Sequence, residues 1–258
     1  MRLATFTHRG TTRAGVVVGD EVVDLGPSEM TALLAAGLER VAEAAAKARA
    51  RLPLAQVRLE APVLRPPKFL AVGLNYADHV AESGAERPAL PTFFNKQSTC
   101  VTGPYDPIHR PRVSPLLDYE GELGFVIGRR CRHVPRARAA EAIAGWVVLN
   151  DVSVRDWQLR VPTWTMGKSF DTHGPMGPWI VTADELGDPH ALRLRTWVNG
   201  ELRQDSSTAQ LIFDSFALVE QLSTAFTLEP GDVVRVEIER IGHIENRVVD
   251  EPDDTARL

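Results

Sequence analysis

The chain has 258 residues, of which 44% are hydrophobic and 24% are charged. This length allows one large core, or a large core with a small module, and the composition excludes a disordered or collagen-like chain. The formal net charge of −5 excludes an overall positive field that would hold a nucleic-acid backbone, and two cysteines, Cys100 and Cys131, are too few for a disulfide scaffold or an all-thiolate zinc site.

The N-terminal residues lose their apolar character too early for a signal peptide. No run in the sequence approaches the roughly 20 apolar residues of a membrane-spanning helix. We therefore expect a cytoplasmic protein with neither a membrane nor a nucleic acid as its partner.

Residues 1–65 predict a small α+β domain. The β runs 16–18 and 21–23 flank Gly19 and Asp20, and glycine readily takes the positive φ of a two-residue turn, so a hairpin is expected. Two helices should follow, one capped by Ser28 and reaching Ala36, and an alanine-rich one over 38–51. Prolines then mark a domain boundary at Pro62, Pro66 and Pro67.

Residues 66–258 predict a second, larger and mostly β domain. Residues 192–205 should form a hairpin whose Asn199-Gly200 turn is of type I′, and the runs 233–238 and 243–249 should form another. Helices are expected only at 76–83, 137–143 and 216–225. The fold class is therefore α+β but mostly β, a sandwich or barrel-like roll with peripheral helices.

Carboxylates gather at two places in this domain. Glu120 and Glu122 lie two residues apart, so a strand would present both on one face, where they would need either solvent or a cation. Asp151 ends an apolar run that begins at Gly145, a pattern that suits either a turn or a carboxylate delivered to a cleft. As three hard oxygen ligands, these residues would suit Mg²⁺ or Mn²⁺.

Two further segments carry groups that suit acid–base chemistry. On a helix, His79 and Glu82 are neighbours, so the carboxylate could orient the imidazole, although a single histidine near a helix start is more often structural. Lys168 lies in a loop rich in glycine and proline, where it is either a solvated surface group or a cation that stabilises an enolate. Several nearby residues suit packing as well as pocket lining: Phe94, Lys96, Trp164 and Thr165.

Together these segments resemble the fumarylacetoacetate hydrolase superfamily, in its acylpyruvase and 2-hydroxyhepta-2,4-diene-1,7-dioate isomerase-like branch. The resemblance extends over residues 68–249, and the N-terminal module resembles the small domain that often precedes this part. The matching motifs are Asn75-Tyr76 with His79 and Glu82, Glu120-Gly121-Glu122-Leu123, the segment 150–158 and the segment 167–171. The resemblance implies a mixed β-sandwich roll, usually a homodimer.

The same resemblance implies roles for individual residues. It places a divalent metal, Mg²⁺ or Mn²⁺, on Glu120, Glu122 and Asp151. It gives catalytic roles to Lys168 and to a His79–Glu82 pair on a helical lid that orders when ligand binds. Arg155 and Gln158 match positions that contact the substrate in some members of the family, so the resemblance implies that they bind substrate.

The implied activity is hydrolysis of a C–C bond in an acylpyruvate-like 1,3-dicarbonyl 2-oxo acid. Decarboxylation of a 2-oxo acid or isomerisation of a dienoic diacid would use the same groups. One departure from the family pattern motivates a third alternative, a silent paralogue that binds a metal or a 2-oxo acid without turnover. Family members carry a Thr-Gly-Thr-Pro segment between two Pro-Gly-Asp turns, whereas here the turn 230–232 continues directly into 233–238.

Overall fold

Most strands belong to one large mixed sheet in the computed structural model, which describes residues 1–235 and 241–253. The strands are β1 (Arg2–His8), β2 (Thr11–Val18), β3 (Glu21–Asp24), β4 (Arg51–Pro53), β5 (Arg58–Leu59), β6 (Phe69–Gly73), β7 (Thr92–Lys96), β8 (Val101–Thr102), β9 (Ile108–Arg110), β10 (Leu117–Asp118), β11 (Gly121–Ile127), β12 (Ile143–Asn150), β13 (Ser153–Val154), β14 (Gly174–Val181), β15 (Arg193–Val198), β16 (Glu201–Ser207), β17 (Val233–Arg235) and β18 (Val248–Asp250).

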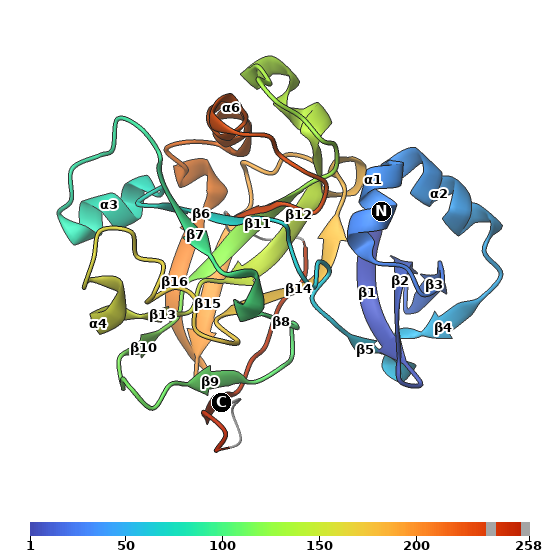
Figure 1. The fold of residues 1–258 in the computed structure, drawn as a ribbon, viewed down its shortest axis with the longest axis horizontal. Coiled ribbons are helices and arrows are strands. Elements are labelled where there is room, and N and C mark those ends of the chain that lie inside the picture. Colours follow the sequence, from blue (N-terminus) through green and yellow to red (C-terminus); the bar gives the residue numbers. More distant parts are fainter. Residues whose placement is uncertain (236–240, 254–258) are drawn as a thin grey trace.

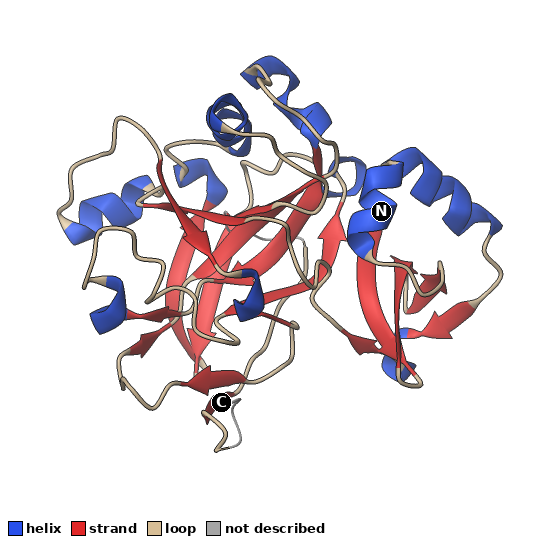
Figure 2. Cartoon of the chain, in the orientation of Figure 1, coloured by secondary structure: helices blue, strands red, loops and turns tan. Residues whose placement is uncertain are grey.

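The main sheet runs in the order β4-β3-β2-β1-β14-β12-β11-β17-β6-β7, with β5 beside β1 and β8 beside β14. Among the described residues, three two-stranded pairs lie outside it: β10 with β13, β15 with β16, and β9 with β18. Figure 2 shows the strands at the centre of the molecule and the helices at its periphery. This arrangement confirms the predicted α+β, mostly β fold.

The helices are short and lie outside the sheet. The α-helices are α1 (Met30–Ala36), α2 (Leu38–Lys47), α3 (Ala77–Ser83), α4 (Arg155–Gln158), α5 (Ala183–Leu186) and α6 (Ser215–Ala225), and the 3₁₀ helices are η1 (Leu54–Gln56), η2 (Ser98–Cys100), η3 (Arg136–Ala142) and η4 (Thr208–Gln210). The predicted helix over 137–143 is therefore a 3₁₀ helix. Ser28 does not cap α1, because Glu29 is the N-cap residue and makes no side-chain capping bond.

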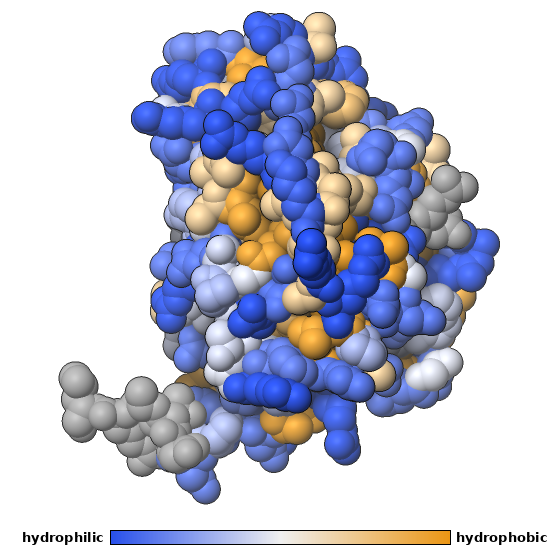
Figure 3. Space-filling model, turned by 90° about the vertical axis from the view of Figure 1, so that its right-hand side faces the viewer, coloured by the Kyte–Doolittle hydropathy of each residue, from blue (hydrophilic) through white to orange (hydrophobic). Residues whose placement is uncertain are grey.

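The N-terminal module forms one lobe, at the right of Figure 1, and it shares the main sheet with the rest of the chain. Its first strand, β1, pairs with β14 through Arg2↔Val181 and Leu3↔Ile180. A single buried cluster contains side chains from both parts, including Leu34 of α1 and Ile180 of β14. Seen from this lobe in Figure 3, the surface is mixed, with hydrophilic residues around apolar patches.

Two of the predicted hairpins are present. β2 and β3 join through Val18↔Glu21. β15 and β16 join at Asn199 and Gly200, whose φ values of 52° and 82° are those that a type I′ turn requires. Among the described residues, no helix is long and apolar enough to cross a bilayer.

The third predicted hairpin is wrong in its pairing. β17 lies between β11 and β6, with which it pairs antiparallel and parallel respectively. The C-terminal strand β18 pairs instead with β9, in parallel. Residues 236–240, the end of the first predicted run and the start of its turn, lie outside the described residues. Alternation of apolar residues predicts a strand, but it does not identify the neighbour with which that strand pairs.

Asn75 fixes the start of the helix that carries His79. It is 5% exposed, its side-chain amide donates to the Phe213 carbonyl at 2.9 Å, and its side-chain oxygen accepts from the Phe213 N–H at 2.9 Å. The Asn75 side chain therefore makes the two hydrogen bonds to the Phe213 backbone that a neighbouring strand would otherwise make. These bonds connect the residue that precedes α3 to the segment that precedes α6.

We expect Asn75→Ala to lower the free energy of unfolding by about 1–3 kcal/mol, because both backbone groups of Phe213, which are partly buried, lose their partner. Urea unfolding measures this difference. Asn95→Ala on the exposed face of β7 is the matched control and should change stability by less than about 0.5 kcal/mol. Equal changes in the free energy of unfolding for the two variants would contradict a stabilising role of the Asn75–Phe213 hydrogen bonds.

Candidate active site

Two paired strands bring Glu120 and Asp151 together. In the antiparallel register of β11 and β12, Gly121 is opposite Asn150, and the ladder continues with the Asp151 N–H donating to the Glu120 carbonyl at 2.8 Å. Residues directly opposite each other in such a ladder present their side chains on the same face. The strand end predicted to deliver Asp151 to a site therefore delivers it beside Glu120.

Polar side chains fix the backbone at this strand end. The Asn150 side-chain oxygen accepts from the Glu120 N–H at 3.0 Å, and the Gln204 side-chain oxygen accepts from the Gly121 N–H at 2.9 Å. Gln204 lies on β16, so the β15–β16 hairpin braces the acidic segment from outside the main sheet. Both contacts restrict the position of the Glu120 carboxylate.

The ammonium of Lys168 lies between the two carboxylates. Its Nζ is 2.7 Å from Glu120 Oε2 and 2.8 Å from Asp151 Oδ2. The sequence allowed Lys168 to be either a solvated surface group or part of a site. Its side chain is only 3% exposed, so it is not a solvated surface group. A buried ammonium is costly unless it is paired and hydrogen-bonded, so both carboxylates are needed to hold it.

A second buried lysine completes this cluster. Lys96, the last residue of β7, has a side chain with no exposed surface, and its Nζ is 2.5 Å from Asp151 Oδ1. Nζ also donates to the main-chain carbonyl of Lys168. Asp151 is thus bound by one lysine on each carboxylate oxygen, and Lys96 connects its carboxylate to the backbone of Lys168.

Arg155, the first residue of α4, stands at the outer side of the cluster. Its guanidinium is 2.6 Å from Glu120 Oε1 and 2.7 Å from Asp118 Oδ2, and it donates to Gln158 Oε1 at 2.8 Å. Burial alone would lower the pKa of Arg155, but the charges of Glu120 and Asp118 raise it above its ordinary value. Arg155 therefore stays positively charged, and it holds Gln158 beside Glu120.

The predicted metal ligands are only partly assembled. Within residues 1–235 and 241–253, no three His, Cys, Asp or Glu side chains are grouped closely enough to hold a metal ion. Glu120 and Asp151 nevertheless converge on one cation, the Lys168 ammonium, and Glu122 follows on the same strand face. Hard carboxylate oxygens directed at a common cation are the donors that Mg²⁺ and Mn²⁺ prefer, so the donor set fits such an ion.

The predicted His79–Glu82 pair makes no polar contact with this cluster among the described residues. Both residues are on the exposed side of α3, and neither side chain makes a hydrogen bond or ion pair with a described residue. The helix itself is held by Asp78, which accepts from the Ser206 hydroxyl at 2.5 Å. The hairpin that braces the Glu120 segment through Gln204 thus also holds α3.

Aromatic rings line the cluster on the side of β7. The centre of the Phe94 ring lies 5.4 Å from Lys168 Nζ. It is 5.5 Å from the centre of the Trp164 ring, in an edge-to-face arrangement. Trp164 has a φ of 59°, a strained value for a bulky residue, and its ring covers Gly73 so closely that a Cβ there would overlap it. This packing gives the cluster an apolar wall.

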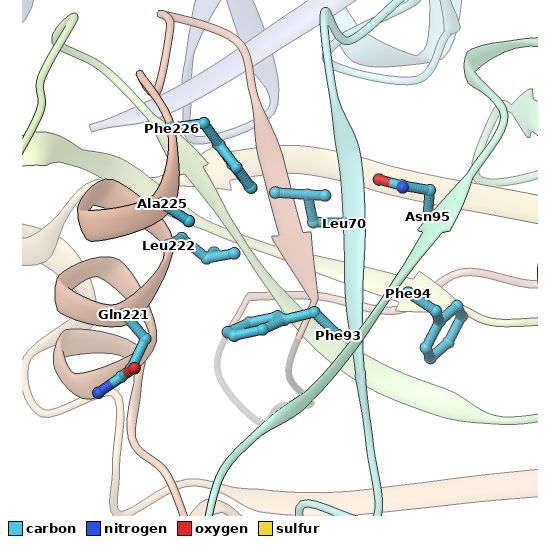
Figure 4. A pocket seen from close by; sticks show the side chains of 8 residues that line it. All are labelled: Leu70, Phe93, Phe94, Asn95, Gln221, Leu222, Ala225 and Phe226. Atoms are coloured by element: carbon cyan, nitrogen blue, oxygen red, sulfur yellow. The ribbon is translucent and has the colours of Figure 1, made fainter. Parts of the chain in front are cut away.

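An apolar cavity of about 140 Å³ lies on the other side of β7, against α6. Figure 4 shows Phe93 pointing toward α6 beside Leu70 and Leu222, while the ring of the next residue, Phe94, lies on the opposite side of the strand. Phe94 is also among the residues that line the cavity, so it lies between the cavity and the charged cluster.

His173 is a neutral group behind the cluster. It is fully buried, its Nε2 is 2.9 Å from the His109 carbonyl, and its Nδ1 has no partner among the described residues. Burial lowers the pKa of His173 to about 4, so the imidazole is uncharged at neutral pH. The positive charge near Asp151 therefore comes from the two lysines.

Sequence reasoning missed part of this site. Lys96 was only one of several residues near the motifs, although it shares the buried face of β7 with Phe94, and a lysine on such a face needs a carboxylate. Asp118 stands two residues before Glu120, where alternation could have indicated it. Gln204 carries no local signal, because its contact depends on how the separate hairpin packs.

Comparison with known proteins identifies the family. The model "Fumarylacetoacetate (FAA) hydrolase C-terminal" matches residues 68–236. The mitochondrial oxaloacetate tautomerase Fahd2a of Rattus norvegicus is 38% identical over 287 residues, covering 96% of this chain and 92% of its own. That match is longer than this chain, so the rat protein carries residues within it that are missing here.

Solved structures agree with this assignment. A maleylpyruvate hydrolase from Sphingobium sp. SYK-6, solved with manganese(II) and pyruvate, has a TM-score of 0.82 and 33% identity, covering 98% of this chain and 100% of its own. The 5-carboxymethyl-2-hydroxymuconate delta-isomerase of Mycobacterium smegmatis has a TM-score of 0.82 and 37% identity, covering 97% and 100% respectively. The chain belongs to the fumarylacetoacetate hydrolase family, whose named relatives here include hydrolases, isomerases and a tautomerase.

Proposed function

We propose that this chain is a divalent-metal-dependent hydrolase that cleaves a C–C bond in acylpyruvate-like 2-oxo acids. The observation that carries the proposal is the buried cluster in which the Lys168 ammonium lies 2.7 Å from Glu120 and 2.8 Å from Asp151. Such a cluster offers carboxylates to a cation and a cation to a substrate carboxylate. A relative of 33% identity that was solved with manganese(II) and pyruvate supports this choice.

The proposed ligands of the metal are Glu120, Glu122 and Asp151, and the proposed ion is Mg²⁺ or Mn²⁺. When bound, such an ion supplies Lewis-acid stabilisation to the oxygens of a 2-oxo acid. Each carboxylate lies on the face that β11 and β12 share. The two strands therefore hold the donors in a fixed arrangement, which limits the choice of cation.

The chain's own side chains would orient the substrate and move protons. Lys168 would donate to the carboxylate and enolate oxygens, because its ammonium is buried and its charge is needed where the enolate forms. Arg155 would hold the amide of Gln158 toward the same site. The apolar wall of Phe94 and Trp164 would exclude water from this side.

His79 and Glu82 would activate the water, provided that α3 closes over the site when substrate binds. Water would lose a proton to this pair and add to the acyl carbonyl carbon. The bond between that carbon and C3 would then break, and its electron pair would pass into the pyruvate enolate, which takes up a proton at C3 to give pyruvate. The products are pyruvate and a carboxylic acid, so the atoms of one water are accounted for.

A second candidate is isomerisation or decarboxylation of a 2-oxo acid at the same cluster. It is favoured by the exposed positions of His79 and Glu82, which make no polar contact with the cluster among the described residues. Without a water activated by that pair, the same cations would stabilise an enolate that is reprotonated rather than cleaved.

The test is the ultraviolet absorbance of enolised acylpyruvates with purified protein, Mg²⁺ or Mn²⁺, and then excess chelator. Metal-dependent loss of the enol signal with formation of equimolar pyruvate and carboxylic acid is the expected result. Loss of signal without cleavage products would support the second candidate. No reaction in folded protein of the correct mass, with any of these acids or with oxaloacetate, would support a silent paralogue and contradict both.

A further inference from the structure

The least expected group in this cluster is a fully buried lysine. Lys96 has a side chain with no exposed surface, and its ammonium lies 5.9 Å from the centre of the Phe69 ring. Desolvating an ammonium costs several kcal/mol, so a lysine in this position needs specific partners. Those partners are Asp151 Oδ1, at 2.5 Å, and the main-chain carbonyl of Lys168.

These contacts divide the two oxygens of Asp151 between different neighbours. Oδ1 is held from behind by Lys96, while Oδ2 lies 2.8 Å from Lys168 Nζ, on the side of Glu120. A carboxylate held in this way can offer Oδ2 to a cation on the Glu120 side, but it can offer both oxygens only by giving up the buried ammonium. Lys96 therefore sets the orientation of Asp151.

Resting on the proposed function, we propose that Lys96 is a positioning residue that selects the cation by restricting Asp151 to one ligating oxygen. Ca²⁺ takes six to eight oxygen ligands and accepts bidentate carboxylates, whereas Mg²⁺ requires a compact octahedron. Restricting Asp151 to a single oxygen lowers the number of ligands and disfavours the larger ion. Lys96 also donates to the main-chain carbonyl of Lys168. The same residue therefore positions Asp151, the proposed metal ligand, and Lys168, the lysine proposed to contact the substrate.

The test compares Mn²⁺ binding with Ca²⁺ binding, without any substrate. The free Mn²⁺ signal in electron paramagnetic resonance gives the Mn²⁺ affinity, and competition gives the Ca²⁺ affinity. In Lys96→Met, we expect the preference for Mn²⁺ over Ca²⁺ to fall by about tenfold or more, because Asp151 can then use both oxygens. Losing the Lys96 charge strengthens the binding of both divalent ions alike, so the ratio isolates the geometry of the carboxylate.

Lys68→Met is the matched control, because Lys68 also pairs with a fully buried aspartate, Asp232 at 2.9 Å, rather than with Asp151. Its ion preference should equal that of the wild type, and thermal unfolding should show that both variants are folded. An unchanged preference in folded Lys96→Met would overturn the inference while leaving the metal site intact. Wild-type protein that binds no Mn²⁺ would instead contradict the proposed function itself.

A second measurement does not depend on the variant's folding. A crystal structure of the wild type with Mn²⁺ should show Asp151 ligating through one oxygen, with Lys96 Nζ still bound to the other. Bidentate Asp151, or a Lys96 that has moved away from it, would contradict the positioning role.

Discussion

Asp151→Asn is expected to lower turnover by about 10³-fold and to abolish measurable Mn²⁺ binding at micromolar concentrations, because an amide replaces a carboxylate ligand and the Lewis acid is lost. The variant should also lose about 3–5 kcal/mol of stability, since two buried ammonium groups, those of Lys96 and Lys168, lose the carboxylate that they share. Turnover with excess Mn²⁺, titration of Mn²⁺ binding and urea unfolding measure these three quantities.

Asp232→Asn separates the chemical effect from the loss of stability. Asp232 is also fully buried and paired with a lysine, Lys68, but it precedes β17 at the opposite end of β11 from Glu120. This variant should be destabilised while it keeps its Mn²⁺ affinity and its turnover. If Asp151→Asn still binds Mn²⁺ like the wild type, the assignment of Asp151 as a ligand is wrong.

Lys168→Met should have a different signature from Asp151→Asn. Turnover should fall by about 10²–10³-fold, the loss expected for one donor aimed at a developing oxyanion. Mn²⁺ binding, in contrast, should become tighter, because the ammonium that lies between Glu120 and Asp151 no longer repels the divalent ion. Measuring Mn²⁺ affinity and kcat on the same sample checks both changes.

Lys68→Met again provides the control, because the Lys68 ammonium is paired with Asp232 rather than with Glu120 or Asp151, and its loss should alter neither quantity. A Lys168→Met protein with weaker Mn²⁺ binding would mean that Lys168 organises the carboxylates rather than competing for them. A protein with normal kcat would remove Lys168 from the proposed reaction. Mn²⁺ affinity and kcat are independent measurements. The first tests whether Lys168 competes with the metal ion, and the second tests whether it takes part in the reaction.

Local signals in the sequence were sufficient for much of the fold. A type I′ turn requires positive φ at both central positions, which Asn and Gly tolerate, and the hairpin that Asn199-Gly200 predicts is present. The apolar run ending at Asn150 is a buried strand. The pairing of β17 and β18 was not predictable in this way, because each short apolar strand could pair with several partners and long-range packing chooses among them.

Within the candidate site, the sequence predicted the residue types and their grouping but not their present contacts. Lys168 and Asp151 were both expected at one site, and they are 2.8 Å apart. His79 and Glu82 were expected on a helical lid that orders when ligand binds; they lie on the exposed side of α3, and their role stays a prediction. Helical spacing relates those two residues to each other, but it carries no information about the distance from their helix to the sheet.

By itself, the sequence indicated the family, through motifs spread over residues 75–171. It also predicted the strand that leads to Asp151 and the neighbouring carboxylates at positions 120 and 122, because each of these signals depends on neighbours within a few residues. Only the tertiary structure decided that Lys96 is buried against Asp151, that the Lys168 ammonium lies between two carboxylates, and that the β15–β16 hairpin braces both α3 and the Glu120 segment. These contacts join residues that are tens of positions apart. Their existence depends on the free energy of burying charged groups together, which no local pattern expresses.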